Sequence, residues 1–462
     1  MAISPARKIA FDVLLRVESE GAYASDLLHA ALGANVRAPD ASLATEITLG
    51  VLRRRRLLDF LLERHAKKSL DRFDLPVAIA LRMALYQLRF LERIPAHAAV
   101  YESAELVKRA RKTSAAGLVN AILRRCAEES KSPAESFLPP SASLAERLGI
   151  LHSHPTWLVE RWLARFGENR TVALLEANNS APRLACALGD EKNRAETFAG
   201  LQKDGLQLAP GRLLKSAFAV AAGSPSRTDA FRKGLFSIQD EASQAIPLLL
   251  GVCSGEKVLD LCAAPGGKTA SLVRAAGSTG LVIAADIHAH RLRATRAQFE
   301  RLHLGESRLV ALDASQPLPF RAAFDRILVD APCSGTGTLA RHPEIRWRLT
   351  AGQLTEFHQL QKAMVRQAVA QLAPGGRLVY STCSLEPEEN EALIAEAIED
   401  IARLSHAPRV IRVPAREAAA ALAPYLAEGV HAESLFDPLG QLRTFPGEHL
   451  TDGFFAALLE LH

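Results

Sequence analysis

Apolar side chains recur every three to four residues through the first part of the chain. Ile9, Val13 and Val17 fall on one side of a helix, and Ser4-Pro5 before them supplies an N-cap residue and a proline at the first helical position. The same spacing returns at residues 42–67, 75–93, 97–112 and 115–128. This pattern has no strand-like alternation, and it predicts an all-helical N-terminal domain over residues 1–132.

The second half of the chain contains short runs of apolar and β-branched residues, which are typical of buried parallel strands. These runs lie at residues 257–261, 281–285, 308–312, 327–329 and 377–379. One helix is expected from Glu388 to about Ile401, and Phe454, Phe455 and Leu458 predict a closing strand. We therefore expect an α/β, Rossmann-like domain over residues 231–462.

The region between these two domains is less regular. Residues 133–142 are rich in proline and predict a linker. A helix-like run that ends near Asn178 and the stretch after Pro182 predict a small α+β domain over residues 143–230. Within it, Cys186 is expected to be a core residue.

Composition adds limits on where such a protein acts. Hydrophobic residues make up 48% and charged residues 23% of the 462 positions, which are ordinary values for a soluble multidomain protein. No run of about 18 apolar residues exists, and the first residues lack the apolar core of a secretory signal, so we expect no membrane segment. The six cysteines show no metal-like CxxC spacing. These features predict a cytoplasmic protein without a metal site.

The basic residues are concentrated in the first domain. Residues 1–126 hold 21 Lys and Arg against 13 Asp and Glu, a balance of +8, whereas the rest of the chain has 35 against 38, or −3. The excess comes mainly from four clusters: Arg53 to Arg56, Lys67-Lys68, residues 108–112 and Arg124-Arg125. Such a distribution favours a polyanionic partner, although solvated helix surfaces also carry charge.

A Gly-rich turn follows the strand-like run at residues 257–261. Its residues, Cys262 to Thr269, lack the first glycine of a phosphate-binding P-loop and the three-glycine pattern of a nicotinamide site. Asp286, Asp313 and Asp330 end the next three strands, and an acid at the position of Asp286 is typical of a ribose ligand. S-adenosylmethionine fits better than either alternative because it has a ribose but no phosphate. Asp260 is read as a structural acid at a strand end.

Cysteines follow two of these strands: Cys333 comes three residues after Asp330, and Cys383 comes after the run at residues 377–379. Ligand sites of open α/β sheets lie at the carboxyl ends of the strands, so the two thiols are expected at one edge. A thiolate is a strong nucleophile, which suggests covalent catalysis. The alternative is a pair of buried, inert cysteines.

With these motifs the sequence resembles the RNA cytosine-5 methyltransferase family. The resemblance covers residues 234–462 in the expected order, and it is carried by these segments: residues 236–244, Asp260 to Thr269, Asp330 to Gly335, residues 341–347, Ser381 to Ser384, and Pro387 to Glu391. Residues 1–132 resemble the NusB family of helical RNA-binding domains, through residues 81–88, 94–95 and 119–124. The family pattern weakens after Leu184, where Ala185 to Asp190 depart from it.

The resemblance implies S-adenosylmethionine as the cofactor and assigns its ligands. The methionine end would lie along Cys262, Ala263, Ala264, Pro265, Gly266, Gly267 and Lys268. Asp286 would bind the ribose, Asp313 the adenine amino group, and Asp330 would lie near the methyl-donor end. Cys262 is expected to pack or to offer its backbone rather than react.

For catalysis, the resemblance implies that Cys383 adds to carbon 6 of cytosine and that Cys333 assists release of the enzyme. The Pro-Cys pair at Cys333 also resembles the nucleophile segment of DNA cytosine methyltransferases, which would reverse the two roles. Asp330 is expected to contact cytosine N3 or N4. Lys268 is expected to lower the thiolate pKa or to bind RNA.

The expected partner is small-subunit (16S) ribosomal RNA before full assembly, because bacterial family members with a NusB-like domain act on it. A tRNA methyltransferase and a non-enzymatic RNA-binding factor are the alternatives. Protein partners are not indicated. Arg341, Arg346, Trp347 and Arg348 are candidate RNA contacts, with core packing an equal alternative for Trp347.

Overall fold

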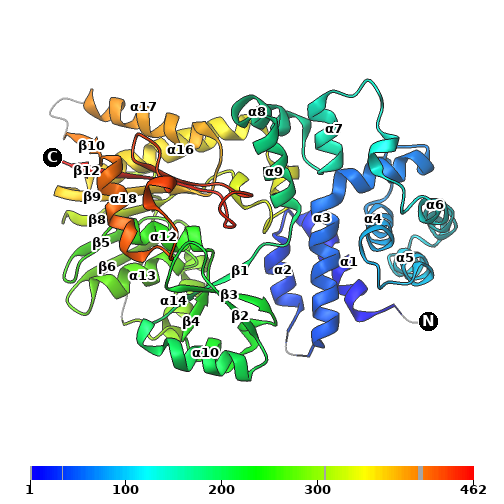
Figure 1. Ribbon diagram of the computed structural model, residues 1–462, viewed down its shortest axis with the longest axis horizontal. Coiled ribbons are helices and arrows are strands. Elements are labelled where there is room, and N and C mark those ends of the chain that lie inside the picture. The colour runs from blue at the N-terminus through cyan, green and yellow to red at the C-terminus, as the bar shows by residue number, and fades with distance from the viewer. Residues whose placement is uncertain (1–2, 34, 306–307, 404–408) are drawn as a thin grey trace. The chain divides into compact units, whose positions relative to one another are not determined.

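The computed structural model describes residues 3–33, 35–305, 308–403 and 409–462. The chain divides into two compact units, whose elements are labelled in Figure 1. The first unit contains Met1–Ala181 and, from much later in the sequence, Leu339–Arg348. The second contains Pro182–Thr338 and Leu349–His462.

The helices predicted for residues 1–132 lie in the first unit, which also contains residues 143–181 of the predicted small α+β domain. Its α-helices are α1 (Pro5–Glu20), α2 (Ala24–Ala31), α3 (Ala38–Ala66), α4 (Leu75–Phe90), α5 (Ala96–Arg109), α6 (Ala116–Glu128), α7 (Leu144–Leu151), α8 (Thr156–Phe166), α9 (Glu168–Asn179) and α15 (Ile345–Arg348). The sequence pattern missed α2, because eight residues are too few to establish a helical period. None of the helices in the described residues is both long and apolar enough to span a membrane.

Ser4 occupies the predicted N-cap position of α1, but its side chain does not cap the helix. Its backbone N–H and its hydroxyl both donate to Glu102 Oε2, at 2.8 and 2.9 Å. The residue therefore links the start of α1 to α5 rather than satisfying the first turn of its own helix.

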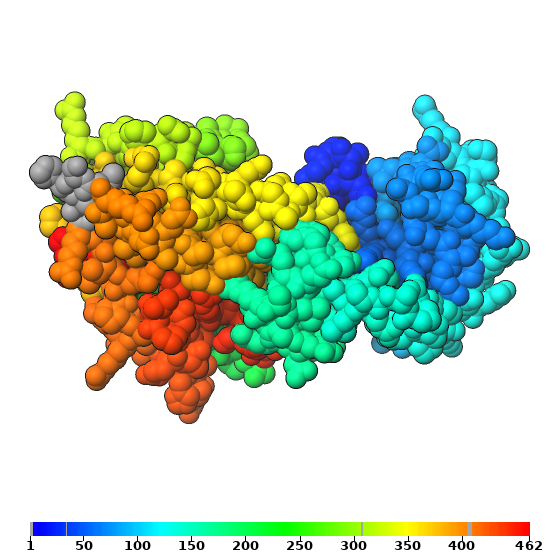
Figure 2. Space-filling model, turned by 90° about the horizontal axis from the view of Figure 1, so that it is seen from above, coloured from blue at the N-terminus to red at the C-terminus, as the bar shows by residue number. Residues whose placement is uncertain are grey.

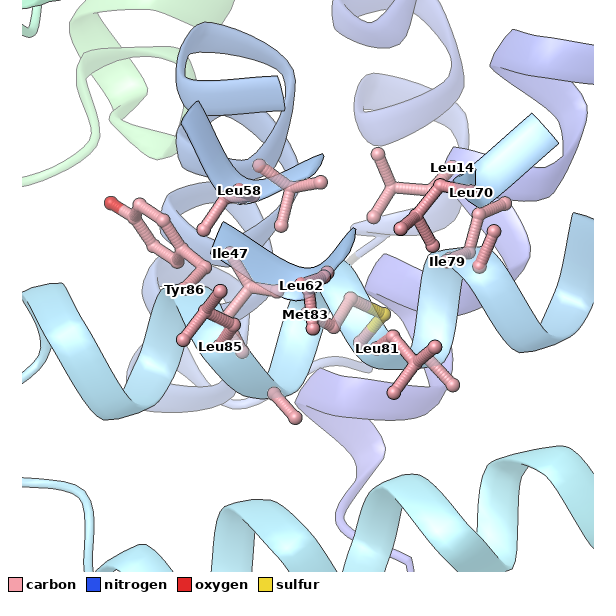
Figure 3. Packing of buried hydrophobic residues seen from close by; sticks show 14 of the residues in the cluster. Leu14, Ile47, Leu58, Leu62, Leu70, Ile79, Leu81, Met83, Leu85 and Tyr86 are labelled. Atoms are coloured by element: carbon pink, nitrogen blue, oxygen red, sulfur yellow. The ribbon is translucent and has the colours of Figure 1, made fainter. Parts of the chain in front are cut away.

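The core of the first unit lies where α1, α3, α4 and α6 meet. Leu58 and Leu62 of α3 face Leu81 and Met83 of α4, and all four side chains are buried (Figure 3). Burial of one such side chain is worth roughly 1.5–3 kcal/mol, so the buried residues of this cluster stabilise the unit.

The proline-rich segment predicted as a linker packs against this core. Residues 134–137 form a short 3₁₀ helix, η3 (Ala134–Phe137), and both Ala134 and Leu138 are buried. Arg64 lies 3.5 Å above the centre of the Phe137 ring. The sequence did not predict this packing, because the buried side chains are too sparse to give a period.

The second unit begins with a small antiparallel sheet of order β2-β3-β1-β4. Its elements are β1 (Leu184–Leu188), α10 (Arg194–Lys203), β2 (Gln207–Pro210), β3 (Ala217–Ala222), α11 (Asp229–Arg232) and β4 (Phe236–Ile238). Cys186 lies in its core with no exposed surface, as expected. This sheet is the predicted small α+β element, and it continues to β4, past the predicted boundary at residue 230.

The larger sheet has the strand order β10-β12-β9-β8-β5-β6-β7, with β11 paired to β12. The strands are β5 (Lys257–Asp260), β6 (Leu281–Asp286), β7 (Arg308–Ala311), β8 (Phe324–Asp330), β9 (Leu372–Thr382), β10 (Val410–Arg412), β11 (Gln441–Thr444) and β12 (Phe454–Leu461). Strands β5 to β9 run parallel, as predicted. The predicted closing strand is β12, but it lies between β9 and β10 and pairs antiparallel with both.

Helices cover both faces of this sheet (Figure 1). One face packs against α12 (Glu241–Leu249), α13 (Gly267–Ala276) and α18 (Ala415–Leu422), and the other against α16 (Ala351–Ala370) and α17 (Glu391–Ala402). Leu328 faces the first group, whereas its neighbours Ile327 and Val329 face the second. Helices α16 and α17 lie side by side on the surface in Figure 2. Burial on both faces explains the continuous apolar runs of these strands.

Candidate active site

Five parallel strands bring the predicted site residues to one edge of the large sheet. Asp286 ends β6, Asp330 ends β8, and Cys383 directly follows β9. The turn that starts at Leu261 follows β5, and Asp313 lies two residues beyond β7. Since parallel neighbours share their carboxyl edge, these groups lie along the edge at which such sheets bind ligands.

The Gly-rich turn packs tightly between β5 and α13. Gly266 has φ of +100°, and a Cβ atom there would lie 2.8 Å from Thr295 Cγ2. Its backbone N–H donates to the carbonyl oxygen of Ala263 at 2.7 Å. Glycine is required here because a side chain would be both strained and too close to α14 (Ala289–Arg301). The turn thus presents bare backbone and the first N–H groups of α13 at the sheet edge.

Asp286 lies beside this turn and is 4% exposed. One of its oxygens accepts from the His288 backbone N–H at 2.9 Å, and the other lies 3.3 Å from the Ala264 nitrogen and 3.7 Å from Arg291 Nη1. On the next strand, Asp313 accepts from the backbone N–H and the hydroxyl of Ser315, at 2.9 and 2.6 Å. Backbone and side-chain bonds therefore hold both carboxylates in place.

The charge of this edge suits S-adenosylmethionine. Asp286, Asp313 and Asp330 offer carboxylate acceptors, and the molecule presents hydroxyls, an amino group, an ammonium and a sulfonium, all donors or cations. A phosphate-bearing cofactor would meet like charge instead. No group of three or more His, Cys, Asp or Glu within the described ranges is arranged to hold a metal ion.

Below the turn, Asp260 is almost completely buried and accepts from the Thr269 hydroxyl at 2.6 Å. Burial raises the pKa of this carboxyl from 3.8 to about 7, with a further contribution from the charge of Asp330. Asp260 therefore ties the last residue of β5 to α13, in agreement with the structural role expected of it.

Lys268 and Asp330 form an ion pair, with Lys268 Nζ 2.6 Å from Asp330 Oδ2. The other carboxylate oxygen of Asp330 accepts from the Ser381 hydroxyl at 2.7 Å. The pairing fixes Asp330 between β8 and β9, next to the cysteine turns. Lys268 accordingly acts on Asp330, and the structure provides no bond from it to a thiol in the described residues.

The two predicted cysteines are in contact. Cys333 Sγ and Cys383 Sγ lie 3.4 Å apart, because β8 and β9 are adjacent and place Asp330 opposite Ser381. The hydrogen bond with Cys383 and burial raise the pKa of Cys333 well above its ordinary value. Burial also raises the pKa of Cys262 well above that value, which agrees with its expected unreactive role. The contact allows a hydrogen bond between the two thiols in which either sulfur is the donor.

Glu389 is a residue of this site to which the sequence assigned no role. It belongs to the short helix η7 (Pro387–Glu389) and is completely buried, and the Ser334 backbone N–H donates to its carboxylate at 2.8 Å. Burial raises its pKa. The segment Pro387 to Glu391 carries part of the family resemblance, and that resemblance was the one sign in the sequence that Glu389 belongs to the site.

Hydrogen bonds within the first unit hold Arg346, Trp347 and Arg348, and burial removes the Arg346 side chain from any contact with RNA. Arg346 is fully buried in the first unit and donates to four oxygens, those of Ser153, Asn178, Asn179 and Leu339. Trp347 Nε1 donates to the Leu52 carbonyl, and Arg348 donates to the carbonyls of Val17, Gly21 and Ala22. These side chains, together with the same segment's Arg341, belong to Leu339–Arg348, which is part of the first unit.

The run Arg53 to Arg56 is also structural rather than a free basic surface. Arg53 donates twice to the Ala340 carbonyl, at 3.1 and 2.7 Å, and Arg56 donates to the His154 carbonyl and the Thr156 hydroxyl. Arg55 lies 3.3 Å from Glu18. By contrast, Lys67, Lys68, Arg124 and Arg125 are exposed. A charge count does not reveal which arginines point inward.

A Rossmann-like sheet with this site defines a methyltransferase, and comparison with known proteins supports that class. Residues 247–460 match the family model for the 16S rRNA methyltransferase RsmB/F, residues 4–128 match the NusB family, and residues 154–226 match an RsmF/B-like, ferredoxin-like domain. The chain belongs to the 16S rRNA methyltransferase RsmB/F family. This membership confirms the predicted fold and S-adenosylmethionine as the cofactor.

Individual relatives agree over nearly the whole chain. The probable ribosomal RNA small subunit methyltransferase B of Bacillus subtilis (strain 168) is 31% identical, over 97% of this chain and 97% of its own length. The crystal structure of PH0851 has a TM-score of 0.81 at 24% identity and covers 100% of this chain and 99% of its own, which shows the shared fold. A methyltransferase homolog from Pyrococcus horikoshii has a TM-score of 0.56 at 28% identity, over 70% of this chain and 99% of its own.

Proposed function

We propose that this protein transfers a methyl group from S-adenosylmethionine to carbon 5 of a cytosine in 16S ribosomal RNA, through a covalent bond between Cys383 and carbon 6. The observation that carries the proposal is the contact between two thiols, 3.4 Å apart, at the ligand edge of a methyltransferase sheet. Carbon 5 of cytosine is a poor nucleophile until a nucleophile adds at carbon 6. One thiol is needed for that addition, and the second serves the elimination.

In this mechanism the Cys383 thiolate adds to carbon 6, and the electron pair of the C5–C6 double bond moves toward carbon 5 and N3. Asp330 accepts a hydrogen bond from the N4 amino group, held in place by Lys268 and Ser381. When bound, S-adenosylmethionine supplies the electrophilic methyl group. Cofactor binding is assigned to residues 262–268 with Asp286, Asp313 and Asp330.

Cys333 completes the reaction. After it loses its thiol proton to solvent, its thiolate takes the proton from carbon 5, and the C5–H electron pair restores the C5–C6 double bond. The Cys383 thiolate then leaves, and the pair again shares one proton. The raised pKa of Cys333 suits this role, because a thiol of high pKa is a strong base once it is deprotonated.

The remaining parts of the chain are assigned to RNA. We infer that residues 1–132 capture the polyanion with the exposed Lys67, Lys68, Arg124 and Arg125, that residues 143–230 add contacts, and that residues 231–462 carry out catalysis. The substrate is ribosomal RNA before full subunit assembly, and the place of action is the cytoplasm. These assignments are supported by the family and by the charge balance of +8 in residues 1–126.

A radiolabelled methyl donor separates the roles of the thiols. Cys383→Ala should abolish methylation and leave no covalent RNA adduct. Cys333→Ala should stall after methyl transfer, and a denaturing gel should then show a labelled protein–RNA band of reduced mobility. Adduct formation by Cys383→Ala but not by Cys333→Ala would reverse the two roles. Label at a position other than cytosine carbon 5, found by nucleoside analysis, would reject the reaction itself.

A further inference from the structure

One buried carboxylate bonds to the residues that follow both cysteines. Ser334 comes directly after Cys333, and Ser384 directly after Cys383. The Ser334 backbone N–H donates to Glu389 Oε1 at 2.8 Å, and the hydroxyls of both serines donate to Glu389 Oε2. Two other bonds also join the turns beyond the strand ends: the Gly337 N–H donates to the Cys383 carbonyl at 2.9 Å, and the Leu385 N–H donates to the Thr336 hydroxyl at 2.8 Å. The Glu389 bonds add a side-chain link directly beside the two cysteines.

Neighbouring groups support the carboxylate from behind. Gln361 Nε2 of α16 donates to Glu389 Oε1 at 3.0 Å and to the Pro332 carbonyl at 2.9 Å, so it also holds the residue before Cys333. The two serine hydroxyls lie 3.0 Å from each other. The carboxylate of Glu389 is thus bonded to both cysteine turns and to Gln361, which itself bonds to the turn that contains Cys333.

The next residue, Asn390, secures the end of β9. The Thr382 hydroxyl donates to Asn390 Oδ1 at 2.6 Å, and Asn390 Nδ2 donates to the Ser384 carbonyl at 2.8 Å. The Tyr380 hydroxyl donates to the Glu389 carbonyl at 2.7 Å. Residues on both sides of Cys383 are therefore bonded to this two-residue segment.

We propose that Glu389 is the positioning residue of the cysteine pair: its carboxylate holds Ser334 and Ser384 together and so sets the 3.4 Å separation of the two thiols. Charge-assisted hydrogen bonds are shorter and stronger than neutral ones, so a carboxylate fixes this geometry more firmly than an apolar contact does. The role matters because one thiol adds and the other completes elimination on the same ring. The inference rests on the proposed function.

Burial makes this arrangement a demanding one. A buried carboxylate is costly unless hydrogen bonds satisfy it, and here a backbone N–H, an amide and two hydroxyls do so. The negative charge of Glu389 also contributes to the raised pKa of Cys333. Glu389 thus favours the protonated form of one thiol of the pair while fixing its distance from the other.

The separation of the thiols is measurable without RNA. Diamide accepts two electrons and two protons from a pair of thiols and leaves one disulfide, and mass spectrometry of the full-length protein would quantify the Cys333–Cys383 peptide pair over time. Glu389→Ala should slow this cross-link and the initial methylation rate by about ten- to hundredfold, as misplacement of reacting groups by about 1 Å does. Its affinity for S-adenosylmethionine, measured by calorimetry, should stay within about twofold of wild type.

Conservative and control variants separate positioning from general damage. Glu389→Gln keeps an acceptor for the Ser334 N–H and a polar group for both hydroxyls, so it should restore most of both rates. Glu399 lies on α17, and Glu399→Ala removes an exposed ion pair with Arg403, so this variant should behave as wild type. Should Glu389→Ala fail to fold, Ser384→Ala removes one bond to the carboxylate, together with the bonds of the Ser384 hydroxyl to the Glu386 N–H and the Ser334 hydroxyl, and is expected to slow the cross-link in the same way.

The inference is overturned if folded Glu389→Ala or Ser384→Ala forms the cross-link at the wild-type rate. It is also overturned if cofactor affinity falls in parallel with methylation, because the defect would then be a general collapse of the site. A wild-type protein that cross-links readily but does not methylate cytosine carbon 5 would instead contradict the proposed function. The two failures are therefore distinguishable.

Discussion

Replacement of Arg346 by alanine should unfold the first unit at lower denaturant concentration. Arg346 is 0% exposed, and its two Nη atoms donate to Ser153 O, Asn179 Oδ1, Asn178 O and Leu339 O at 3.0 to 3.2 Å. These acceptors come from the α7–α8 turn, the end of α9 and the segment 339–348 itself. Arg346 therefore joins three stretches of chain that are distant in sequence.

The size of the loss follows from two opposed terms. Each buried acceptor left without a donor costs about 1–3 kcal/mol, and truncation of one member of a buried charged network costs about 3–5 kcal/mol. In the opposite direction, the variant no longer buries a charge, and burial lowers the pKa of Arg346 from 12.5 to about 9. That pKa is still above neutral pH, so the guanidinium is charged under assay conditions. We expect a net loss of about 3 kcal/mol in the free energy of unfolding.

Intrinsic fluorescence isolates the relevant transition. The protein has three tryptophans, and Trp157, Trp162 and Trp347 all belong to the first unit. Urea unfolding followed by tryptophan emission thus reports this unit, and with a slope of about 1–3 kcal/mol per molar the midpoint should fall by about 1–3 M. The midpoint of Arg346→Lys should lie between those of wild type and Arg346→Ala, because an ammonium is a point donor that does not span four acceptors.

Arg124→Ala is the matched control, since Arg124 is exposed on α6 of the same unit. It should leave the free energy of unfolding within about 0.5 kcal/mol of wild type, and so barely move the midpoint. An equal midpoint for Arg346→Ala and Arg124→Ala would contradict this expectation. It would mean that the four hydrogen bonds only offset the cost of burying the guanidinium and add nothing to the free energy of unfolding.

Three further outcomes test the site and the RNA surface. Asp286→Ala should weaken S-adenosylmethionine binding by about tenfold or more, from loss of a charge-assisted hydrogen bond of ~1.5–3 kcal/mol, and unchanged calorimetric affinity in a folded variant would reject the ribose assignment. The raised folded-state pKa of Asp260, about 7 against 3.8, means that stability present at low pH is lost as pH rises from 4 to 7. Asp260→Asn should remove that slope, so its stability relative to wild type should grow with pH by up to ~4 kcal/mol; parallel curves in thermal unfolding would contradict this. Arg124→Glu with Arg125→Glu should weaken ribosomal RNA binding and lower the salt slope by about two, whereas an unaltered slope would show that this surface is merely solvated.

The sequence predicted the catalytic edge because its information is local. The parallel strands of the large sheet contain continuous apolar runs, and the residues predicted for the site end or follow them, as at Asp286, Asp330 and Cys383. Parallel topology then requires these residues to share an edge. The 3.4 Å contact of the thiols follows from the adjacency of β8 and β9, which the runs do not specify by themselves.

Residues whose partners are distant in sequence were misread. The partner of Arg53 is a carbonyl 287 residues away, and Arg348 bonds to carbonyls more than 320 residues away. A basic residue in a helix looks the same in sequence whether it faces solvent or a buried carbonyl. The sequence assigned no role to Glu389 for a similar reason, since the role proposed for it depends on two serines in different turns.

The membership of Leu339–Arg348 in the first unit has a consequence for biosynthesis. Helices α1 to α9 leave the ribosome early, but Glu344, which accepts from the Ala24 N–H, and Ala340, which accepts from Arg53, appear only after residues 182–338 have been made. Domains of a nascent chain generally fold in order from the N-terminus. Here the helical unit cannot complete its hydrogen bonds from Arg53 and the Ala24 N–H until most of the second unit has been translated. A chain cut anywhere between residues 182 and 338 therefore releases a helical fragment that lacks part of its own interior.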